Sequence, residues 1–136
     1  METEKAAEHA RQPQAVLMKT VLVVDDEYLI RWALKEGLKE TFRVLTAASV
    51  PEALALLKAE TVHAVVTDLR MPGGNGMQLV EALRAAGPEV KIFVISAYGS
   101  DDVIDRLFQL EVDGYVRKPF EIELVRDMLL TRLGAS

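Results

Sequence analysis

The stretch VLVVDD, at residues 21–26, places four apolar residues directly before two acids. Three of these apolar residues are β-branched, a composition typical of a strand that is buried on both faces. Similar runs recur along the chain, so the sequence predicts a sheet of five strands. The other four strands are expected at Phe42–Thr46, Ala64–Val66, Lys91–Ile95 and Gly114–Val116.

Each predicted strand is followed by a segment with the apolar periodicity of a helix. These helices are expected at Glu27–Lys39, Glu52–Ala59, Gly76–Ala85, Asp101–Leu110 and Glu121–Leu133. Strands that alternate with helices predict a parallel sheet covered on both faces, because each crossover helix must pack against it. We therefore expect an α/β fold with a doubly wound five-stranded sheet in the order 2-1-3-4-5, a flavodoxin-like three-layer sandwich.

Local signals support the predicted helix ends. Ser49 and Glu52 have the spacing of a capping box, and Ser100 is suited to cap the fourth helix. The dipeptide Gly87-Pro88 is expected to end the third helix.

The composition favours one small domain in a reducing compartment. The chain has 136 residues, which is enough for one core, and it has no cysteine. Sixteen Lys and Arg against 21 Asp and Glu give a net charge of -5, which argues against direct binding of nucleic acid. Because no stretch resembles a signal peptide or a membrane span, we expect a cytoplasmic protein. Residues 1–17 are expected to form a flexible polar tail, and residues 18–134 the domain.

Charged or hydroxyl side chains follow four of the five predicted strands. Asp25 and Asp26 follow the first strand, Asp68 the third, Ser96 the fourth and Lys118 the fifth. The second strand ends in two alanines, as expected of an edge strand. Ligands of doubly wound sheets bind at the carboxyl ends of the strands, so these residues are the candidate site.

Three carboxylates at neighbouring strand ends favour a hard divalent cation. Either Asp25 or Asp26 alone is also a common helix N-cap. Together with Asp68, however, they would repel one another unless a cation were present, and Mg²⁺ suits such a set of oxygens. Zinc is disfavoured because no histidine joins the group: His9 lies in the tail, and His63 begins a strand.

The remaining two strand ends suit a phosphoryl group. The Lys118 ammonium is placed to neutralise phosphate charge, and the Ser96 hydroxyl to hydrogen-bond a phosphate oxygen. A carboxylate nucleophile forms an acyl phosphate by established chemistry, which makes Asp68 the candidate acceptor.

Four sequence motifs resemble those of the receiver domain of two-component response regulators, and they occur in the same order. Their residues are most similar to those of receivers of enhancer-binding activators. They are VLVVDDEYLIR at 21–31, VVTDLRMPGGNG at 65–76, ISAYGS at 95–100 and YVRKPF at 115–120.

The resemblance implies a role for each matching residue. Asp68 would accept a phosphoryl group from a histidine kinase, beside Mg²⁺, or Mn²⁺ as a substitute. The metal ligands would be Asp26, Asp68 and the Arg70 main-chain carbonyl, with Asp25 acting through water. Further roles fall to phosphoryl-binding Ser96, Ala97 and Lys118, to the switch pair Ser96 and Tyr115, and to a cis peptide bond before Pro119.

The resemblance also implies the partners. A sensor histidine kinase or phosphotransfer protein would supply the phosphoryl group. A downstream protein or an output domain would read it on the face made by the fourth helix, fifth strand and fifth helix, where homodimers also form. The chain would catalyse only its own phosphoryl transfer and dephosphorylation, so it would not be a conventional enzyme. It is either a stand-alone receiver or part of a larger protein.

Three other classes of protein compete with this interpretation. An Mg²⁺-dependent phosphohydrolase with an aspartyl nucleophile needs a general acid two residues after Asp68, where Arg70 stands. A flavodoxin-like cofactor binder needs a phosphate loop after the first strand, where acids would repel the phosphate. A purely structural interaction domain would not need the complete set of site residues.

Overall fold

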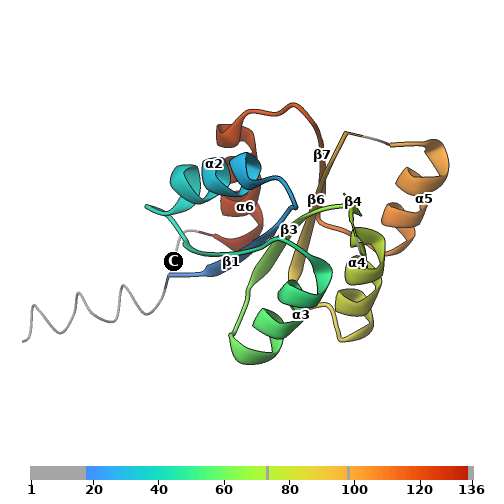
Figure 1. The fold of residues 1–136 in the computed structure, drawn as a ribbon, viewed down its shortest axis with the longest axis horizontal. Helices are drawn as coiled ribbons and strands as arrows, with labels where there is room; N and C mark the ends of the chain where they lie inside the picture. The colour runs from blue at the N-terminus through green and yellow to red at the C-terminus, as the bar shows by residue number, and fades with distance from the viewer. Residues whose placement is uncertain (1–17, 73, 98, 135–136) are drawn as a thin grey trace, which may run out of the picture.

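A five-stranded parallel sheet forms the centre of the molecule (Figure 1). The computed structural model describes residues 18–72, 74–97 and 99–134, so the predicted tail at 1–17 lies outside the described residues. The main strands are β1 (Thr20–Val24), β2 (Arg43–Ala47), β3 (Ala64–Asp68), β6 (Lys91–Ser96) and β7 (Gly114–Arg117). The helices are α2 (Tyr28–Leu38), α3 (Val50–Ala59), α4 (Gly76–Ala85), α5 (Asp101–Gln109) and α6 (Ile122–Leu133).

The spatial order of the sheet is β2-β1-β3-β6-β7. Counted along the chain, this is the predicted order 2-1-3-4-5. All five strands run parallel, and the alanine-ended β2 lies at one edge. The fold prediction is therefore confirmed, and the carboxyl ends of β1 and β3 lie side by side.

The alternation of side chains along β1 divides the core into two layers. Val21 and Val23 pack in one apolar cluster, with side chains of α2 and α6. Leu22 and Val24 pack in the other, with side chains of α3, α4 and α5. Every residue of β1 is buried, which explains why this strand shows an unbroken apolar run. Helices consequently cover both faces of the sheet, as Figure 1 shows.

The capping predictions for two helices are confirmed. The Ser49 hydroxyl accepts the Glu52 main-chain N–H at 3.3 Å, while the Glu52 carboxylate accepts from Ala48 N–H at 2.6 Å. The Ser100 hydroxyl accepts the Val103 main-chain N–H at 3.3 Å and begins α5.

The alternative role of Asp25 or Asp26, as the N-cap of the first helix, is not the one that the structure shows. The N-cap of α2 is Glu27, which makes no side-chain capping bond within the described structure. Asp25 instead accepts the Glu27 main-chain N–H at 2.9 Å, so its carboxylate is held at the end of β1.

One small element was not predicted. After β3, the chain forms a two-stranded antiparallel hairpin, β4 (Arg70–Met71) with β5 (Gly74–Asn75). The other differences are shifts of one or two residues at the ends of elements, where local patterns carry least information.

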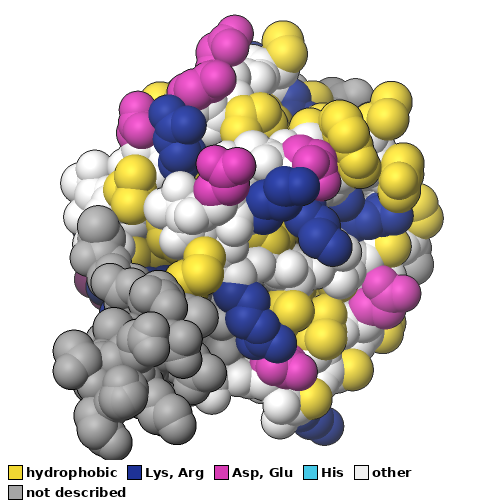
Figure 2. Space-filling model, turned by 90° about the vertical axis from the view of Figure 1, so that its left-hand side faces the viewer, with side chains coloured by type: hydrophobic (Ala, Val, Ile, Leu, Met, Phe, Trp, Pro, Cys, Tyr) yellow, Lys and Arg dark blue, Asp and Glu magenta, His cyan; other side chains and the backbone are white. Residues whose placement is uncertain are grey.

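Charged side chains of both signs are mixed on the face shown in Figure 2, where Lys and Arg lie among Asp and Glu. The exposed ion pairs Lys39–Glu36, at 2.8 Å, and Arg43–Glu60, at 3.0 Å, illustrate this mixing. Such pairs contribute little to stability because solvent screens them.

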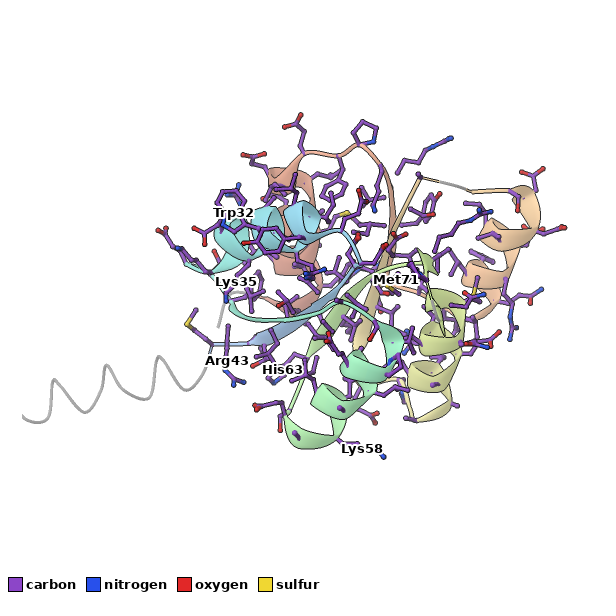
Figure 3. All side chains as sticks on the ribbon, viewed as in Figure 1. Trp32, Lys35, Arg43, Lys58, His63 and Met71 are labelled. Atoms are coloured by element: carbon purple, nitrogen blue, oxygen red, sulfur yellow. The ribbon has the colours of Figure 1, made fainter. Side chains whose placement is uncertain are left out.

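His63 has a structural role at the amino end of the sheet. Its Nδ1 accepts the Thr20 main-chain N–H at 2.9 Å, and its own main chain pairs with Thr20 and Lys91. In Figure 3, His63 lies near Arg43 and away from Met71. Met71 marks the site end of the sheet, because it follows the carboxyl end of β3 by three residues. The structure therefore keeps His63 apart from the acidic group.

Glu111 ends α5 in an unfavourable backbone conformation. Its φ of 56° lies in the left-handed region, and main-chain bonds from Glu111 to Phe108 (3.0 Å) and from Val112 to Leu107 (3.3 Å) form a Schellman motif. This position usually holds glycine, which has no Cβ to clash there.

We expect Glu111→Gly to raise the free energy of unfolding by about 0.5–1 kcal/mol. Relief of the left-handed backbone strain stabilises the folded state by about 1–2 kcal/mol. Glycine also increases the conformational entropy of the unfolded chain, which offsets about 0.5–1 kcal/mol of this gain. Urea denaturation measures the change. Glu89→Gly, at a loop residue without positive φ, is the control and should not stabilise. Equal effects of the two substitutions would contradict the explanation.

Candidate functional site

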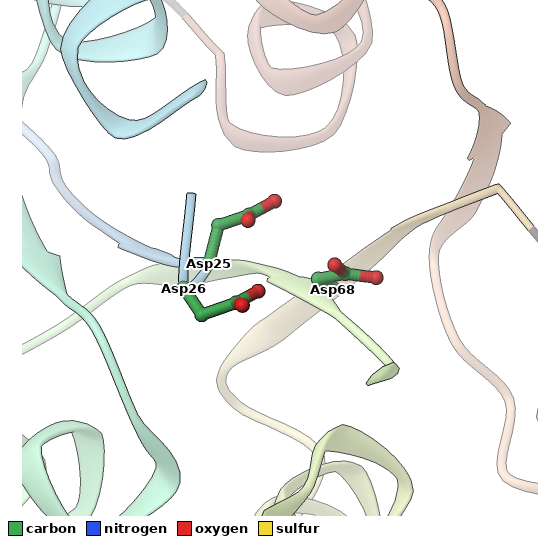
Figure 4. Close-up of side chains that lie close together, drawn as sticks. All are labelled: Asp25, Asp26 and Asp68. Atoms are coloured by element: carbon green, nitrogen blue, oxygen red, sulfur yellow. The ribbon is translucent and has the colours of Figure 1, made fainter. Parts of the chain in front are cut away.

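Three carboxylates meet where β1 and β3 end. Asp25 and Asp26 follow β1, and Asp68 is the last residue of β3, the neighbouring strand. One oxygen from each carboxylate lies within 4.8 Å of the others. Figure 4 shows the three side chains gathered at these strand ends. The parallel register thus joins residues that are about forty positions apart in sequence.

Main-chain N–H groups orient the two buried acids. Asp25 is fully buried and Asp68 is 6% exposed, whereas Asp26 lies exposed. Asp68 Oδ1 accepts the main-chain N–H groups of Leu69 at 2.7 Å and Arg70 at 3.3 Å. These bonds fix one oxygen of Asp68 and direct its second oxygen, Oδ2, toward Lys118.

Lys118 joins the acids from the segment after β7. Its ammonium lies 3.0 Å from Asp25 Oδ2, 3.1 Å from Asp68 Oδ2 and 2.9 Å from Glu27 Oε1. Burial of the ammonium lowers its pKa, but the contacts with Glu27, Asp25 and Asp68 outweigh burial and raise the pKa of Lys118 above its usual range. Lys118 therefore remains a fixed positive charge. The peptide bond between Lys118 and Pro119 is cis.

Asp25 carries an incompletely satisfied charge. Burial raises its pKa, while the Glu27 main-chain N–H and the Lys118 ammonium oppose that shift. Its Oδ2 is buried and receives no hydrogen bond from any described residue. The Lys118 ammonium forms an ion pair with this oxygen, but its orientation is not that of a hydrogen bond. A buried oxygen of this kind suits a cation or its bound water.

The charge balance of the group also fits a divalent cation. Four carboxylates (Asp25, Asp26, Glu27 and Asp68) face one ammonium (Lys118), which leaves three uncompensated negative charges among these five residues. An all-oxygen donor set with excess negative charge favours hard ions such as Mg²⁺. The residues present therefore fit the predicted metal.

A cleft of about 220 Å³ opens over the group. Asp26, Asp68, Arg70 and Lys118 line it, together with Glu27 and Ala97. The cleft brings the predicted phosphoacceptor, a predicted metal ligand and the predicted phosphate-binding lysine to one space that solvent reaches.

Ser96 and Tyr115 lie on adjacent strands and on the same face of the sheet. In the parallel register, Tyr115 pairs with Val94 and Ser96 pairs with Arg117, so the two residues are offset by one strand period. Ser96 is 1% exposed, and Tyr115 is half-buried against the core layer that faces α4 and α5. The structure thus brings the predicted switch pair close in register, and Ala97 follows at the cleft.

Glu27 is the site residue that the sequence interpretation missed. The sequence interpretation places Glu27 only at the start of a helix, whereas its carboxylate contacts Lys118 across 91 positions of sequence. The available signal was its place directly after the acidic pair.

The doubly wound fold and the acidic cleft at its strand ends are typical of a small regulatory domain, and the chain belongs to the response regulator receiver domain family, whose pattern it matches over residues 21–130. The chain is thereby a receiver domain of two-component systems. Within the described residues, no helix has the length and apolar character needed to cross a membrane.

Known proteins resemble the chain in sequence and in fold. It is 42% identical over 102 residues to the hydrogenase transcriptional regulatory protein HoxA of Cupriavidus necator, a match that covers 74% of this chain and 21% of that protein. It is 29% identical over 113 residues to sporulation initiation phosphotransferase F of Bacillus subtilis, covering 82% of this chain and 91% of that protein. The chain therefore spans about a fifth of the length of the hydrogenase regulator.

Among solved structures, a CheY-like response regulator receiver domain protein from Methanospirillum hungatei superposes with a TM-score of 0.81. The two are 26% identical, and the superposition covers 85% of this chain and 94% of that one.

Proposed function

We propose that the chain is a phosphorylation-dependent switch in which Asp68 accepts a phosphoryl group from a sensor histidine kinase or a phosphotransfer protein. One observation carries the proposal: Asp68 lies in a cleft between the Lys118 ammonium, at 3.1 Å, and the two further carboxylates of the acidic group. Sequence likeness to a sporulation phosphotransferase supports a place in a phosphorelay.

Each site residue has a separate role in phosphoryl transfer. An Asp68 carboxylate oxygen bonds to phosphorus while the bond from phosphorus to the histidine nitrogen of the donor breaks, and that nitrogen keeps the electron pair. Lys118 neutralises the phosphoryl oxygens, and the Ser96 hydroxyl with the Ala97 main-chain N–H supplies hydrogen bonds to them.

Asp26, Asp68 and the Arg70 main-chain carbonyl are the proposed direct ligands of Mg²⁺, or of Mn²⁺ in its place, and Asp25 acts through a bound water. The cation supplies charge neutralisation between the acids and the incoming phosphoryl group.

The proposed output is a change on the face made by α5, β7 and α6. When Ser96 turns toward the phosphoryl group, Tyr115 is able to occupy the space it leaves, because both lie on one face of adjacent strands. Ile104 and Phe108 are exposed on α5 by 38% and 83%, so this face has apolar side chains for an output domain, a downstream protein or a second copy of the chain.

The donor protein is proposed to dock beside the cleft. A groove of about 520 Å³ shares Glu27, Ala97 and Lys118 with the site and continues over apolar side chains of α2 and of the segment after β7. Trp32, labelled in Figure 3, is 53% exposed on the same helix, and Leu29 is 72% exposed. A donor seated there is in position to present its phosphohistidine to Asp68.

The competing enzyme function is less well supported. A phosphohydrolase with an aspartyl nucleophile needs a second acid to protonate the leaving oxygen. Arg70, two residues after Asp68, lines the cleft, and a guanidinium does not release a proton as a general acid must.

Incubation with Mg²⁺ and acetyl phosphate tests the proposal. We expect intact-mass measurement to find one added phosphoryl group, which is labile to base and hydroxylamine as an acyl phosphate is. Asp68→Asn should abolish the adduct, and chelation of Mg²⁺ should suppress it. Asp105→Asn, an exposed acid on α5, is the matched control and should leave it unchanged. Phosphorylation that persists in Asp68→Asn would refute the assignment.

A further inference from the structure

Three carboxylates share the Lys118 ammonium in the unphosphorylated chain. Glu27 Oε1 lies 2.9 Å, Asp25 Oδ2 3.0 Å and Asp68 Oδ2 3.1 Å from the Lys118 Nζ. An ammonium has only three donor hydrogens. A phosphoryl oxygen therefore forms a short contact with Lys118 only if one of these carboxylates moves away.

Two of the three carboxylates are fixed in place. Asp25 is fully buried, and its other oxygen accepts the Glu27 main-chain N–H at 2.9 Å. Asp68 is 6% exposed, and its other oxygen accepts two main-chain N–H groups. Asp68 is also the proposed acceptor, so it stays beside Lys118 when it is phosphorylated. Neither carboxylate leaves the ammonium without the loss of main-chain hydrogen bonds.

The carboxylate of Glu27 is held much less firmly. Its side chain is 60% exposed, and it makes no capping hydrogen bond at the start of α2. Among the described residues, this carboxylate has one hydrogen-bond donor, the Lys118 ammonium. Rotation of a single side chain into solvent is enough to break this contact. Of the three carboxylates, Glu27 is therefore the one whose departure costs least.

The contact between Glu27 and Lys118 also lies where a phosphoryl group has to enter. Both residues, with Ala97, line the cleft over Asp68 and the apolar groove beside it. The pair thus stands at the border between the groove proposed for the donor and the acceptor carboxylate. A phosphoryl group that crosses this border is repelled by the Glu27 carboxylate and attracted by the Lys118 ammonium.

We propose that Glu27 is a positioning residue that competes with the phosphoryl group for Lys118. It holds the ammonium in the unphosphorylated chain and gives it up as the phosphoryl group arrives. The inference rests on the proposed function for its reaction, the phosphorylation of Asp68. Because one ion pair has to break before another forms, Glu27 makes this reaction slower and the phosphorylated state less favourable than the other site residues would allow.

Two substitutions separate competition for Lys118 from the general effect of a negative charge. Glu27→Met keeps the length of the side chain and removes its acceptor oxygens. Glu27→Asp keeps the charge on a side chain that is one methylene group shorter. Lys118 is only 13% exposed and is held by Asp25 and Asp68, so we expect it to stay in place and out of reach of the shortened side chain.

The rate of phosphorylation by acetyl phosphate in the presence of Mg²⁺ is the first measurement. An exposed ion pair changes a rate or an equilibrium constant by about 2- to 5-fold, and we expect both Glu27 variants to react faster by such a factor. Glu36→Met is the matched control, because it removes the same kind of side chain from an exposed ion pair of α2, with Lys39 at 2.8 Å. It should leave the rate unchanged.

The binding of beryllofluoride, an analogue of the phosphoryl group, is the second measurement. Fluorine nuclear magnetic resonance in the presence of Mg²⁺ gives its dissociation constant without a covalent reaction. We expect this constant to fall by the same factor in both Glu27 variants and to stay unchanged in Glu36→Met. Removal of a residue with a merely structural role would not make the reaction faster and the binding tighter.

The outcomes distinguish this inference from the proposed function. If the unsubstituted protein reacts at Asp68 and both Glu27 variants react at the same rate or more slowly, Glu27 does not compete for Lys118. A faster reaction of Glu27→Met with an unchanged rate of Glu27→Asp would assign the effect to charge repulsion alone, which also overturns the competition. Failure of the unsubstituted protein to react refutes the proposed function, and the dissociation constants of beryllofluoride then decide the competition by themselves.

Discussion

Lys118→Met should lower the free energy of unfolding in metal-free buffer by about 3–5 kcal/mol, the usual cost of leaving a buried ion pair without one partner. Lys118 is the cation between Asp25, fully buried, and Asp68, 6% exposed. Without it these two carboxylates face each other with no described positive side chain in contact. The variant should also lose phosphorylation by acetyl phosphate, because nothing replaces the ammonium beside the phosphoryl oxygens.

Mg²⁺ should restore part of the lost stability. A cation that binds only the folded protein stabilises it by about 2.7 kcal/mol at a hundred times its dissociation constant. Since the variant group carries one more uncompensated negative charge, we expect the Mg²⁺-induced increase to be larger in Lys118→Met than in the unsubstituted protein.

The loss should also depend on pH. Burial already raises the pKa of Asp25, and removal of Lys118 removes a charge that opposes the shift. An acid whose pKa is higher in the folded state takes up a proton more readily there, so the variant gains stability as pH falls toward that raised value. Lys118 itself, with a raised pKa, stabilises the unsubstituted protein fully below the unfolded value of about 10.4 and loses this effect as pH rises through the folded value.

Urea denaturation at neutral and acidic pH, with and without Mg²⁺, measures these effects. Lys58→Met, at an exposed lysine of α3, is the control. If Lys118→Met and Lys58→Met were equally stable in metal-free buffer, the buried charge cluster would not have the energetic role assigned to it.

Gly76→Ala should cost about 3 kcal/mol of folding free energy, the upper part of the usual range for overpacking. A methyl group at Gly76 would overlap the Asp68 carbonyl oxygen and lie 2.7 Å from Leu69 Cα. Both are main-chain atoms, so no side-chain rotation relieves the contact. Because the main chain of Asp68 and Leu69 must move, the rate of Asp68 phosphorylation should fall as well.

Gly37→Ala is the matched control for this prediction. A methyl group there meets the Cγ2 methyl group of Ile122, a side-chain atom that rotation about χ1 moves, and alanine gains about 1 kcal/mol of helix propensity over glycine inside α2. We expect a much smaller loss of stability and an unchanged rate of phosphorylation. Thermal denaturation and the acetyl phosphate reaction measure both quantities, and equal losses in the two variants would contradict the role of Gly76.

The order of the strands, and the meeting of the residues that follow them, are predictable from local sequence. Strands such as β1 are buried on both faces, so they appear as apolar runs that no solvent-facing periodicity interrupts. Parallel strands also end at one edge of the sheet, which is why the sequence alone predicts that residues directly after strands, such as Asp25 and Asp68, meet.

Tertiary structure alone decided the contacts that join distant segments. Glu27 reaches Lys118 across 91 positions, Arg84 donates to the carbonyl oxygens of Leu110 and Glu111, and the Tyr115 hydroxyl lies against Gly99. Local sequence patterns indicate the periodicity and the ends of a helix or strand, and they carry information only about residues within about one turn or one strand. The partner of a long charged side chain, and the room beside a glycine, depend instead on how helices pack on the sheet. That packing is set by the whole core at once, so no single stretch of the sequence encodes it.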